Sequence, residues 1–205
     1  MVLLMIAGTL SAAPARLDID KSTPIQFESG VGCTRGNFGT GTLETCDITL
    51  RQGSGTLIKA EKGSAKRLSQ GYEDGEWQLN GGVHIEFDDA ILDADSATVL
   101  FADNRLKEVH VRGANGKPAH FSHQVKNTPR RNQGRAATID YDSMAAVLRL
   151  AGDTWYSDGR SAIETAAFTY NLNDGSFFSN ESVKGTVQPD KRVPPPRTPD
   201  RATSQ

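Results

Sequence analysis

The feature that most constrains this chain is the alternation of apolar and polar residues with a period of two. Val83, Ile85 and Phe87 are separated by single polar residues, and Phe168 and Tyr170 are separated by a threonine. A spacing of two places side chains on one face of a β-strand, whereas an amphipathic helix repeats its apolar positions every three or four residues. The chain is therefore predicted to be all-β.

Glycines punctuate this alternation. The chain has 20 of them, and several follow Asp or Asn in dipeptides that accept the positive φ of a tight hairpin turn. These dipeptides are Asp74-Gly75, Asn80-Gly81, Asn115-Gly116, Asp158-Gly159 and Asp174-Gly175. Their spacing predicts neighbouring antiparallel strands of about five to eight residues.

A weak internal repeat supports this organisation. Residues 77–99 resemble residues 148–170 at a constant shift of 71 positions, and residues 45–62 form a poorer third copy. Each copy has the pattern of a strand, a turn and a second strand. Such units bury their apolar face only by stacking on their neighbours. The repeat predicts an elongated, folded-over sheet with an apolar interior and open ends.

Composition excludes several classes of protein. The chain has 205 residues, with 23 Lys plus Arg against 25 Asp plus Glu, and a formal net charge of −2. A nucleic-acid binder would carry a basic excess, and a disordered chain would be poorer in apolar residues. No apolar run approaches the roughly 20 residues of a membrane span. We expect no nucleic-acid partner and one folded domain.

The two ends differ from the middle. Residues 1–15 combine a short apolar stretch with small residues and are interpreted as a secretory signal peptide. The usual basic start is missing, which is consistent with a truncated signal peptide, and a buried first strand is the alternative. Residues 189–205 are rich in proline and basic residues and are predicted to be a disordered tail. The folded domain is assigned to residues 16–188.

Two cysteines, Cys33 and Cys46, lie 13 positions apart with three glycines between them. If the signal peptide directs the chain to an oxidising compartment, these cysteines can close a disulfide that stabilises the fold by roughly 3 kcal/mol. Two free buried cysteines are the competing interpretation.

The polar residues predict no catalytic or metal site. His120 and His123 are three positions apart, so a strand directs them to opposite faces and no metal site is expected. An acidic group is interpreted as solvated outward strand faces and turns. A basic group, interrupted by Pro129 and Gly134, is interpreted as a flexible exposed loop. The acidic group is Glu86, Asp88, Asp89, Asp93 and Asp95, and the basic group is Lys126, Arg130, Arg131 and Arg135. No nucleophile, phosphate-loop or dinucleotide motif occurs, so we predict neither an enzyme nor a cofactor.

Four segments resemble one known family. They are TPIQFES at residues 23–29, GKPAHFS at 116–122, GRAATIDY at 134–141, and residues 147–170, and the similarity covers most of residues 20–188. In their order and spacing they resemble the OstA-like family of lipopolysaccharide-transport bridge proteins. Residues 34–45 and 68–91 depart from the family pattern by about one extra hairpin pair, and the cysteine pair is a further departure.

The resemblance implies an elongated, open-ended β-jellyroll, also called a β-taco, built of stacked antiparallel strands in the periplasm. It implies a carrier of lipopolysaccharide that shields the acyl chains of lipid A between an inner-membrane exporter component and an outer-membrane translocon. It further implies homo-oligomers that stack end to end, with their grooves joined.

The alternating apolar residues are the candidates for the lipid groove. They are Ile25, Phe27, Val83, Ile85, Phe87, Phe121, Ile139, Tyr141, Leu150 and Phe168. The same pattern would also fill an ordinary β core, because inward positions follow from the period alone. Two other functions stay open: a secreted β scaffold that binds glycan or protein partners through its edge strands and, less favoured, a glycan-active enzyme.

Overall fold

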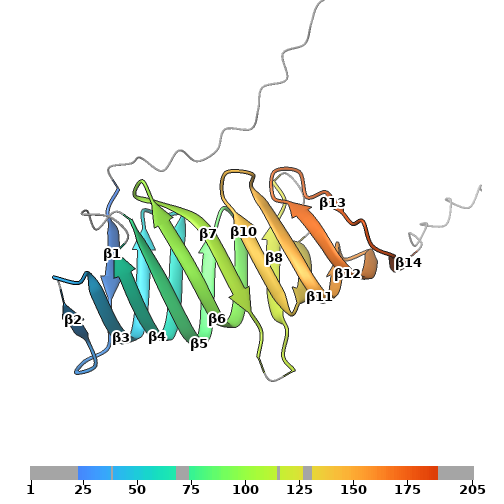
Figure 1. The fold of residues 1–205 in the computed structure, drawn as a ribbon. Coiled ribbons are helices and arrows are strands. Elements are labelled where there is room, and N and C mark those ends of the chain that lie inside the picture. The colour runs from blue at the N-terminus through green and yellow to red at the C-terminus, as the bar shows by residue number, and fades with distance from the viewer. Residues whose placement is uncertain (1–22, 38, 68–73, 115, 127–130, 189–205) are drawn as a thin grey trace, which may run out of the picture.

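A computed structural model describes residues 23–37, 39–67, 74–114, 116–126 and 131–188. The described residues form one sheet of 14 strands (Figure 1). The strands are β1 (Ile25–Glu28), β2 (Arg35–Asn37), β3 (Thr42–Gln52), β4 (Thr56–Arg67), β5 (Gly75–Phe87), β6 (Ala90–Ala102), β7 (Arg105–Arg112), β8 (Ala119–Gln124), β9 (Arg131–Ala136), β10 (Thr138–Asp142), β11 (Val147–Ser157), β12 (Ser161–Asn171), β13 (Phe177–Phe178) and β14 (Lys184–Val187).

The sheet folds over because its long strands pair with different neighbours in their two halves. In β6, residues 90–93 pair with β8 and residues 96–102 pair with β7. In β11, residues 155–157 pair with β9 and residues 147–151 pair with β10. We call the two faces that result the first layer, which contains β1, β8, β9 and β14, and the second layer, which contains β2, β7, β10 and β13. Each of β3, β4, β5, β6, β11 and β12 contributes one half to each layer.

The long strands bend between the two layers, and these bends form one closed side of the molecule, which we call the seam. In β5 the bend is a register shift between Asn80 and Val83, with Gly81 and Gly82 at positive φ. The Asn80-Gly81 dipeptide is therefore not the hairpin turn that the sequence analysis predicted. Because such bends lie inside continuous strands, the long strands have 11–13 residues, and the expected length of five to eight was wrong for them.

The bend shows that the internal repeat is structural. Its counterpart in β11 is a register shift between Ala151 and Thr154, which is the same place after a shift of 71 positions. Gly81 and Gly152 both have a φ of 81°. This left-handed conformation is open to glycine at little cost. The two hairpins β5–β6 and β11–β12 therefore cross the seam in the same way.

The side opposite the seam is formed by the hairpin turns of the two layers, and we call it the mouth. Residues 53–55, 88–89 and 158–160 connect strands at the first layer's rim, and residues 103–104, 143–146 and 172–176 do so at the second layer's rim. The Asp158-Gly159 and Asp174-Gly175 turns are hairpin turns, as predicted.

One predicted loop is a strand instead. Arg131 and Arg135 belong to β9, where they alternate with buried residues and point outward. Gly134 pairs with Phe121 across β8 and β9, and a Cβ at Gly134 would lie 2.0 Å from the Phe121 ring. The glycine that suggested a loop is therefore the site where an aromatic side chain packs on the backbone of the next strand.

The segments assigned to a signal peptide (1–15) and a tail (189–205) lie outside the described residues. Within the described part of the chain, no helix is long and apolar enough to cross a membrane.

Candidate functional site

The space between the two layers is lined by the inward residues of nearly every strand. Eight of the predicted groove residues are buried there: Val83, Ile85, Phe87, Phe121, Ile139, Tyr141, Leu150 and Phe168. Ile25 is half-buried against the same cluster, whereas Phe27 on the end strand β1 is 52% exposed. The structure thus brings the candidate residues together along one apolar interior, with Phe27 at its end.

Aromatic rings fill this interior across the two layers. The ring centres of Phe87 and Tyr141 are 4.1 Å apart, and those of Phe121 and Tyr170 are 5.1 Å apart. The Tyr156 ring packs edge-on to Phe168 at 5.9 Å. Because these pairs join residues of opposite layers, the interior is packed in this state, and a guest molecule would have to part the layers.

Several interior residues were not among the candidates. Trp77, Leu79, Leu92, Val99, Val109, Leu148, Tyr156 and Tyr170 are all buried in the same cluster. The signal that could have found them is the same period of two, continued along β5, β6, β7, β11 and β12. The period alone does not predict where a strand bends. A bend with a bulge changes which residues face inward, so the inward face could not be followed along a whole strand.

Buried polar side chains lie at the mouth. The Asn132 side-chain amide of β9 donates a hydrogen bond to the Tyr170 hydroxyl of β12 (2.8 Å), and His123 Nδ1 of β8 lies 2.9 Å from that hydroxyl. All three residues are at most 6% exposed. Burial lowers the pKa of His123 and raises the pKa of Tyr170 to about 12, so both side chains are neutral near pH 7.

Two further contacts join the rims of the mouth. The Tyr141 hydroxyl of β10 donates a hydrogen bond to an Asp88 carboxylate oxygen in the β5–β6 turn (3.2 Å). The Gln52 side-chain amide at the end of β3 donates to the backbone carbonyl of Asn104 in the β6–β7 turn. The mouth is therefore bridged at three places along the molecule.

The outer surface carries two histidines held between carboxylates. His84 Nδ1 lies 2.6 Å from Asp93 and Nε2 lies 2.8 Å from Glu86, and His110 contacts Asp140 at 3.0 Å and Glu108 at 3.4 Å. Burial alone lowers the pKa of each histidine, but the hydrogen bonds and charges of the carboxylates outweigh it and raise both pKa values. No group of three or more His, Cys, Asp or Glu residues suited to a metal ion occurs among the described residues.

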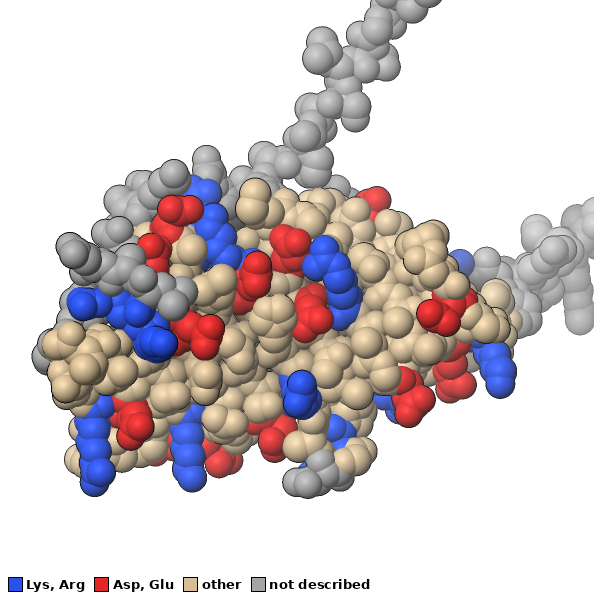
Figure 2. Space-filling view, viewed as in Figure 1, with Lys and Arg blue, Asp and Glu red and all other residues tan. Residues whose placement is uncertain are grey.

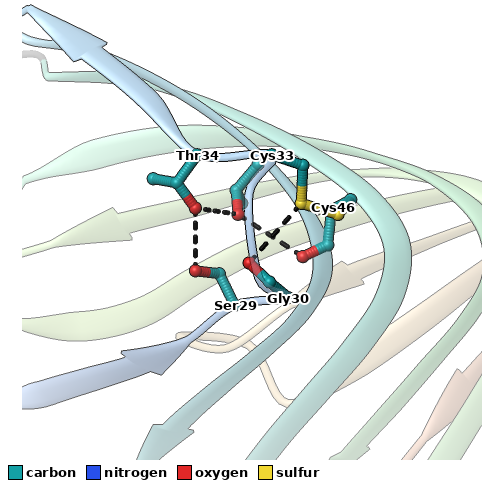
Figure 3. Close-up of a disulfide and its surroundings, with 6 residues drawn as sticks. Ser29, Gly30, Cys33, Thr34 and Cys46 are labelled. Atoms are coloured by element: carbon teal, nitrogen blue, oxygen red, sulfur yellow. Dashed lines mark hydrogen bonds between the residues drawn. A yellow bond between two sulfur atoms is a disulfide. The ribbon is translucent and has the colours of Figure 1, made fainter.

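At the N-terminal end of the seam, the structure joins Cys33 and Cys46 by a disulfide (Figure 3). Cys46 lies at the bend of β3, and Cys33 lies in the segment that leads from β1 in the first layer to β2 in the second. The Gly30 backbone N–H donates to the Cys46 carbonyl (2.8 Å), and the Thr34 and Thr45 hydroxyls are 3.0 Å apart. The connection between β1 and β2 is thus tied covalently to the seam.

The first and last strands leave both ends of the sheet open. Among the described strands, β1 and β2 pair only with β3, while β13 and β14 pair only with β12. Apolar side chains are exposed near these edges: Phe27 on β1, Phe177 (42%) and Phe178 (64%) on β13, and Val187 (74%) on β14. Edge strands with exposed apolar residues are templates for pairing with another chain.

Charge does not single out a binding face. In the view of Figure 2, acidic and basic side chains are interspersed over the surface, in keeping with a formal net charge of −2. The apolar interior and the open ends are therefore the features that distinguish this molecule.

Together these features define a class of protein: a folded-over, open-ended antiparallel sheet with a continuous apolar interior. Residues 57–176, more than half of the chain, match the family model described as "LptA/(LptD N-terminal domain) LPS transport protein". The chain belongs to this family of lipopolysaccharide-transport proteins, as its sequence motifs indicated.

One solved structure similar to this chain is that of LptH, described as "the LptA homologous periplasmic component of the conserved lipopolysaccharide transport device from Pseudomonas aeruginosa". The two share 13% sequence identity with a TM-score of 0.49, over 83% of this chain and 99% of LptH. No curated protein matches the chain.

Proposed function

We propose that this protein carries lipopolysaccharide through the periplasm and shields the acyl chains of lipid A between the two layers of its sheet. The observation that carries this proposal is the continuous apolar interior, lined by β5, β6, β8, β10, β11 and β12, in a member of a lipopolysaccharide-transport family. The protein would act as a binding protein, without a catalytic step.

The energetics favour transfer through a groove over release into water. Each buried methylene contributes roughly 0.8 kcal/mol, so a single twelve-carbon chain accounts for about 10 kcal/mol. Several chains together would exceed the roughly 20 kcal/mol ceiling of non-covalent binding. A lipid held this strongly would leave for water too slowly, so it must slide from one apolar groove into the next.

The open ends support a proposal for how grooves join. The partners would be an inner-membrane exporter component at one end, an outer-membrane translocon at the other, and further copies of this chain between them. Phe27 on β1 and Phe178 on β13 are exposed at opposite ends of the sheet, where two copies could continue each other's layers. Phe178→Glu should weaken self-association in analytical ultracentrifugation, whereas Met144→Glu, exposed in a mouth turn, should not.

Site-specific photocrosslinking tests the carrier function. A photoreactive residue at Ile85 or Phe121 faces the interior, whereas the same residue at Glu86 faces outward on the same strand as Ile85. We expect crosslinks to lipopolysaccharide from positions 85 and 121 and none from position 86. Crosslinks from position 86 alone, or none at all with lipid present, would reject the carrier function. Self-association without lipid uptake would instead favour the scaffold that binds partners through its edges.

A further inference from the structure

Among the described residues, the buried polar side chains lie in two places. Thr45, Thr154 and Thr165 lie at the bends of the seam, and Thr154 donates a hydrogen bond there to the backbone carbonyl of Thr165 (2.7 Å). The others, Gln52, Thr56, His123 and Asn132, lie at the mouth. At the seam, Thr45 and Thr154 donate to backbone carbonyls near the bends, whereas three of the four residues at the mouth reach across to the opposite layer. The second set therefore needs a different explanation.

The contact between His123, Asn132 and Tyr170 has a defined hydrogen-bond pattern. Asn132 Nδ2 can only donate, so the Tyr170 oxygen accepts from it and the Tyr170 hydroxyl hydrogen is available for His123 Nδ1. The Tyr170 hydroxyl donates to Nδ1 when His123 is neutral with its proton on Nε2. One hydroxyl from the second layer is thus held by two side chains from adjacent strands of the first layer.

The backbone brings the two rims together at the same place. Gly175, in the turn after β12, would place a Cβ 2.8 Å from the side chain of Val125 and 3.2 Å from Asn132 Nδ2. His123 pairs with Ala90, the first residue of β6, so the cluster is within two residues of the β5–β6 turn. The mouth is closed here by a turn of one layer resting on a turn of the other.

Opening at the mouth would break hydrogen bonds that are made by side chains. The layers are joined at the seam by continuous backbone, whereas at the mouth they are joined by the bonds of Tyr170, Tyr141 and Gln52. The closed state is also incompletely satisfied, because Gln52 Oε1 is buried with no hydrogen-bond partner among the described residues. A buried oxygen without a partner destabilises the closed state, and a parted mouth would expose it to water.

We propose that the Tyr170 hydroxyl, held by His123 and Asn132, is a latch that keeps the mouth of the empty protein closed, and that it must open for acyl chains to enter sideways. This latch rests on the proposed carrier function. It acts by positioning the two layers, and it sets the rate of lipid entry without contributing apolar contact area. Removing it should therefore accelerate loading while leaving the apolar interior in place.

Two spin labels across the mouth measure the latch directly. Lys126 and Asn173 are exposed in turns of opposite rims and can be changed to cysteine for labelling, with the native disulfide intact. In Tyr170→Phe the distance distribution between the labels should broaden toward longer distances without any lipid. The matched control is Tyr156→Phe, a buried tyrosine of the same aromatic cluster whose hydroxyl makes no recorded hydrogen bond within the described residues.

The rate at which the protein takes up purified lipopolysaccharide is the functional measurement. Loss of a hydrogen bond of ordinary net strength predicts a roughly two- to tenfold faster uptake by Tyr170→Phe, and no change in Tyr156→Phe. If Tyr170→Phe fails to fold, Asn132→Ala removes one arm of the latch and leaves the ring in place, with a smaller effect in the same direction. Equal label distances in wild type and Tyr170→Phe, or equal changes in both tyrosine variants, would overturn the latch.

Closing the mouth covalently completes the test. A bifunctional thiol crosslinker between Lys126→Cys and Asn173→Cys should block lipid uptake that the uncrosslinked variant supports. Undiminished uptake by the crosslinked protein would show entry through the open ends and overturn the latch. If wild type itself takes up no lipopolysaccharide, the carrier function fails, but the label distances still decide whether Tyr170 holds the mouth closed.

Discussion

The two long sides of this folded sheet, the seam and the mouth, close the same interior by different means. At the seam, six strands pass from one layer to the other as continuous backbone, with glycines such as Gly81 and Gly152 at positive φ. At the mouth, separate hairpin turns meet through a few side-chain hydrogen bonds such as Tyr141 to Asp88. A force that parts the layers would meet covalent continuity on one side and weak, reversible contacts on the other.

Because one side is continuous and the other is held by side-chain hydrogen bonds, a packed interior can still open to hold a ligand. If the seam is the stiff side, substitutions there should cost folding free energy. If the mouth is the yielding side, substitutions there should cost little stability and change opening instead. The predictions below test that contrast.

The largest effect is expected at the seam. Gly152 has a φ of 81°, and a Cβ there would lie 2.7 Å from the Cβ of Ala137. Strain and collision together should lower the free energy of unfolding in Gly152→Ala by about 4 kcal/mol, measured by urea denaturation. The control is Gly159→Ala at φ 85° in a mouth turn, where a Cβ meets nothing within 4 Å. It should cost only about 1–2 kcal/mol, and equal losses in the two variants would contradict the contrast.

The next effect concerns the disulfide at the end of the seam. Replacing Cys33 and Cys46 by serine should lower the free energy of unfolding by about 3 kcal/mol, because a cross-link over this sequence separation of 13 restricts the unfolded chain. Wild-type protein unfolded in a thiol reductant should show the same loss. A loss below about 1 kcal/mol would mean that the disulfide does not brace this end.

A smaller effect is expected for the rim contact between Tyr141 and Asp88. A double-mutant cycle of Tyr141→Phe and Asp88→Ala isolates their coupling, since the strain of alanine at the positive φ of position 88 cancels. We expect a coupling of about 0.5–1.5 kcal/mol in urea denaturation. A coupling comparable to the loss in Gly152→Ala would show that the mouth is as rigid as the seam.

The smallest effects on stability are expected from pH. The buried histidine and the two histidines on the outer surface should change stability with pH in opposite directions. Relative to the ordinary value of 6.5, the pKa values of His84 and His110 are raised and that of His123 is lowered. The outer pair therefore stabilises the fold below pH 6.5, and this contribution is lost as the pH rises through their folded pKa values. The contribution of His123 is present above pH 6.5 and is lost as the pH falls toward its folded pKa.

NMR titration of the imidazole signals checks this order, with His→Gln variants for assignment. Asp88, Asp89 and Lys126 face His123 and partly offset one another, and burial is the larger influence on its pKa. His123 should titrate below the two outer histidines. A titration at or above theirs would contradict a neutral His123 that accepts from the Tyr170 hydroxyl.

Much of the fold followed from local pattern. The alternation at Val83, Ile85 and Phe87 predicted a strand with one buried face, and the structure buries all three. The repeat at a shift of 71 positions predicted two equivalent hairpins, and they bend at equivalent residues. These features can be predicted from the sequence because the strand period and the turn residues depend on only a few neighbouring positions.

Other features depended on partners far away in the chain. Asn80-Gly81 carries the same dipeptide signal as a hairpin turn, yet it is a bend inside β5 because β4 and β6 continue the pairing on both sides of it. Gly134 suggested a loop, but the Phe121 ring of the adjacent strand occupies the space above it. The sequence shows where a glycine allows a positive φ or leaves out a side chain. The neighbouring strands decide whether that glycine forms a turn, a bend or a packing site.

The sequence by itself determined the all-β class, the alternation of inward and outward residues, the repeated hairpin and the family. Only the tertiary structure decided which side of the sheet is continuous and which is latched. The reason is physical: strand period and glycine placement are properties of neighbouring residues. The meeting of Tyr170 with His123 and Asn132, 47 and 38 positions away, exists only after the sheet has folded over on itself.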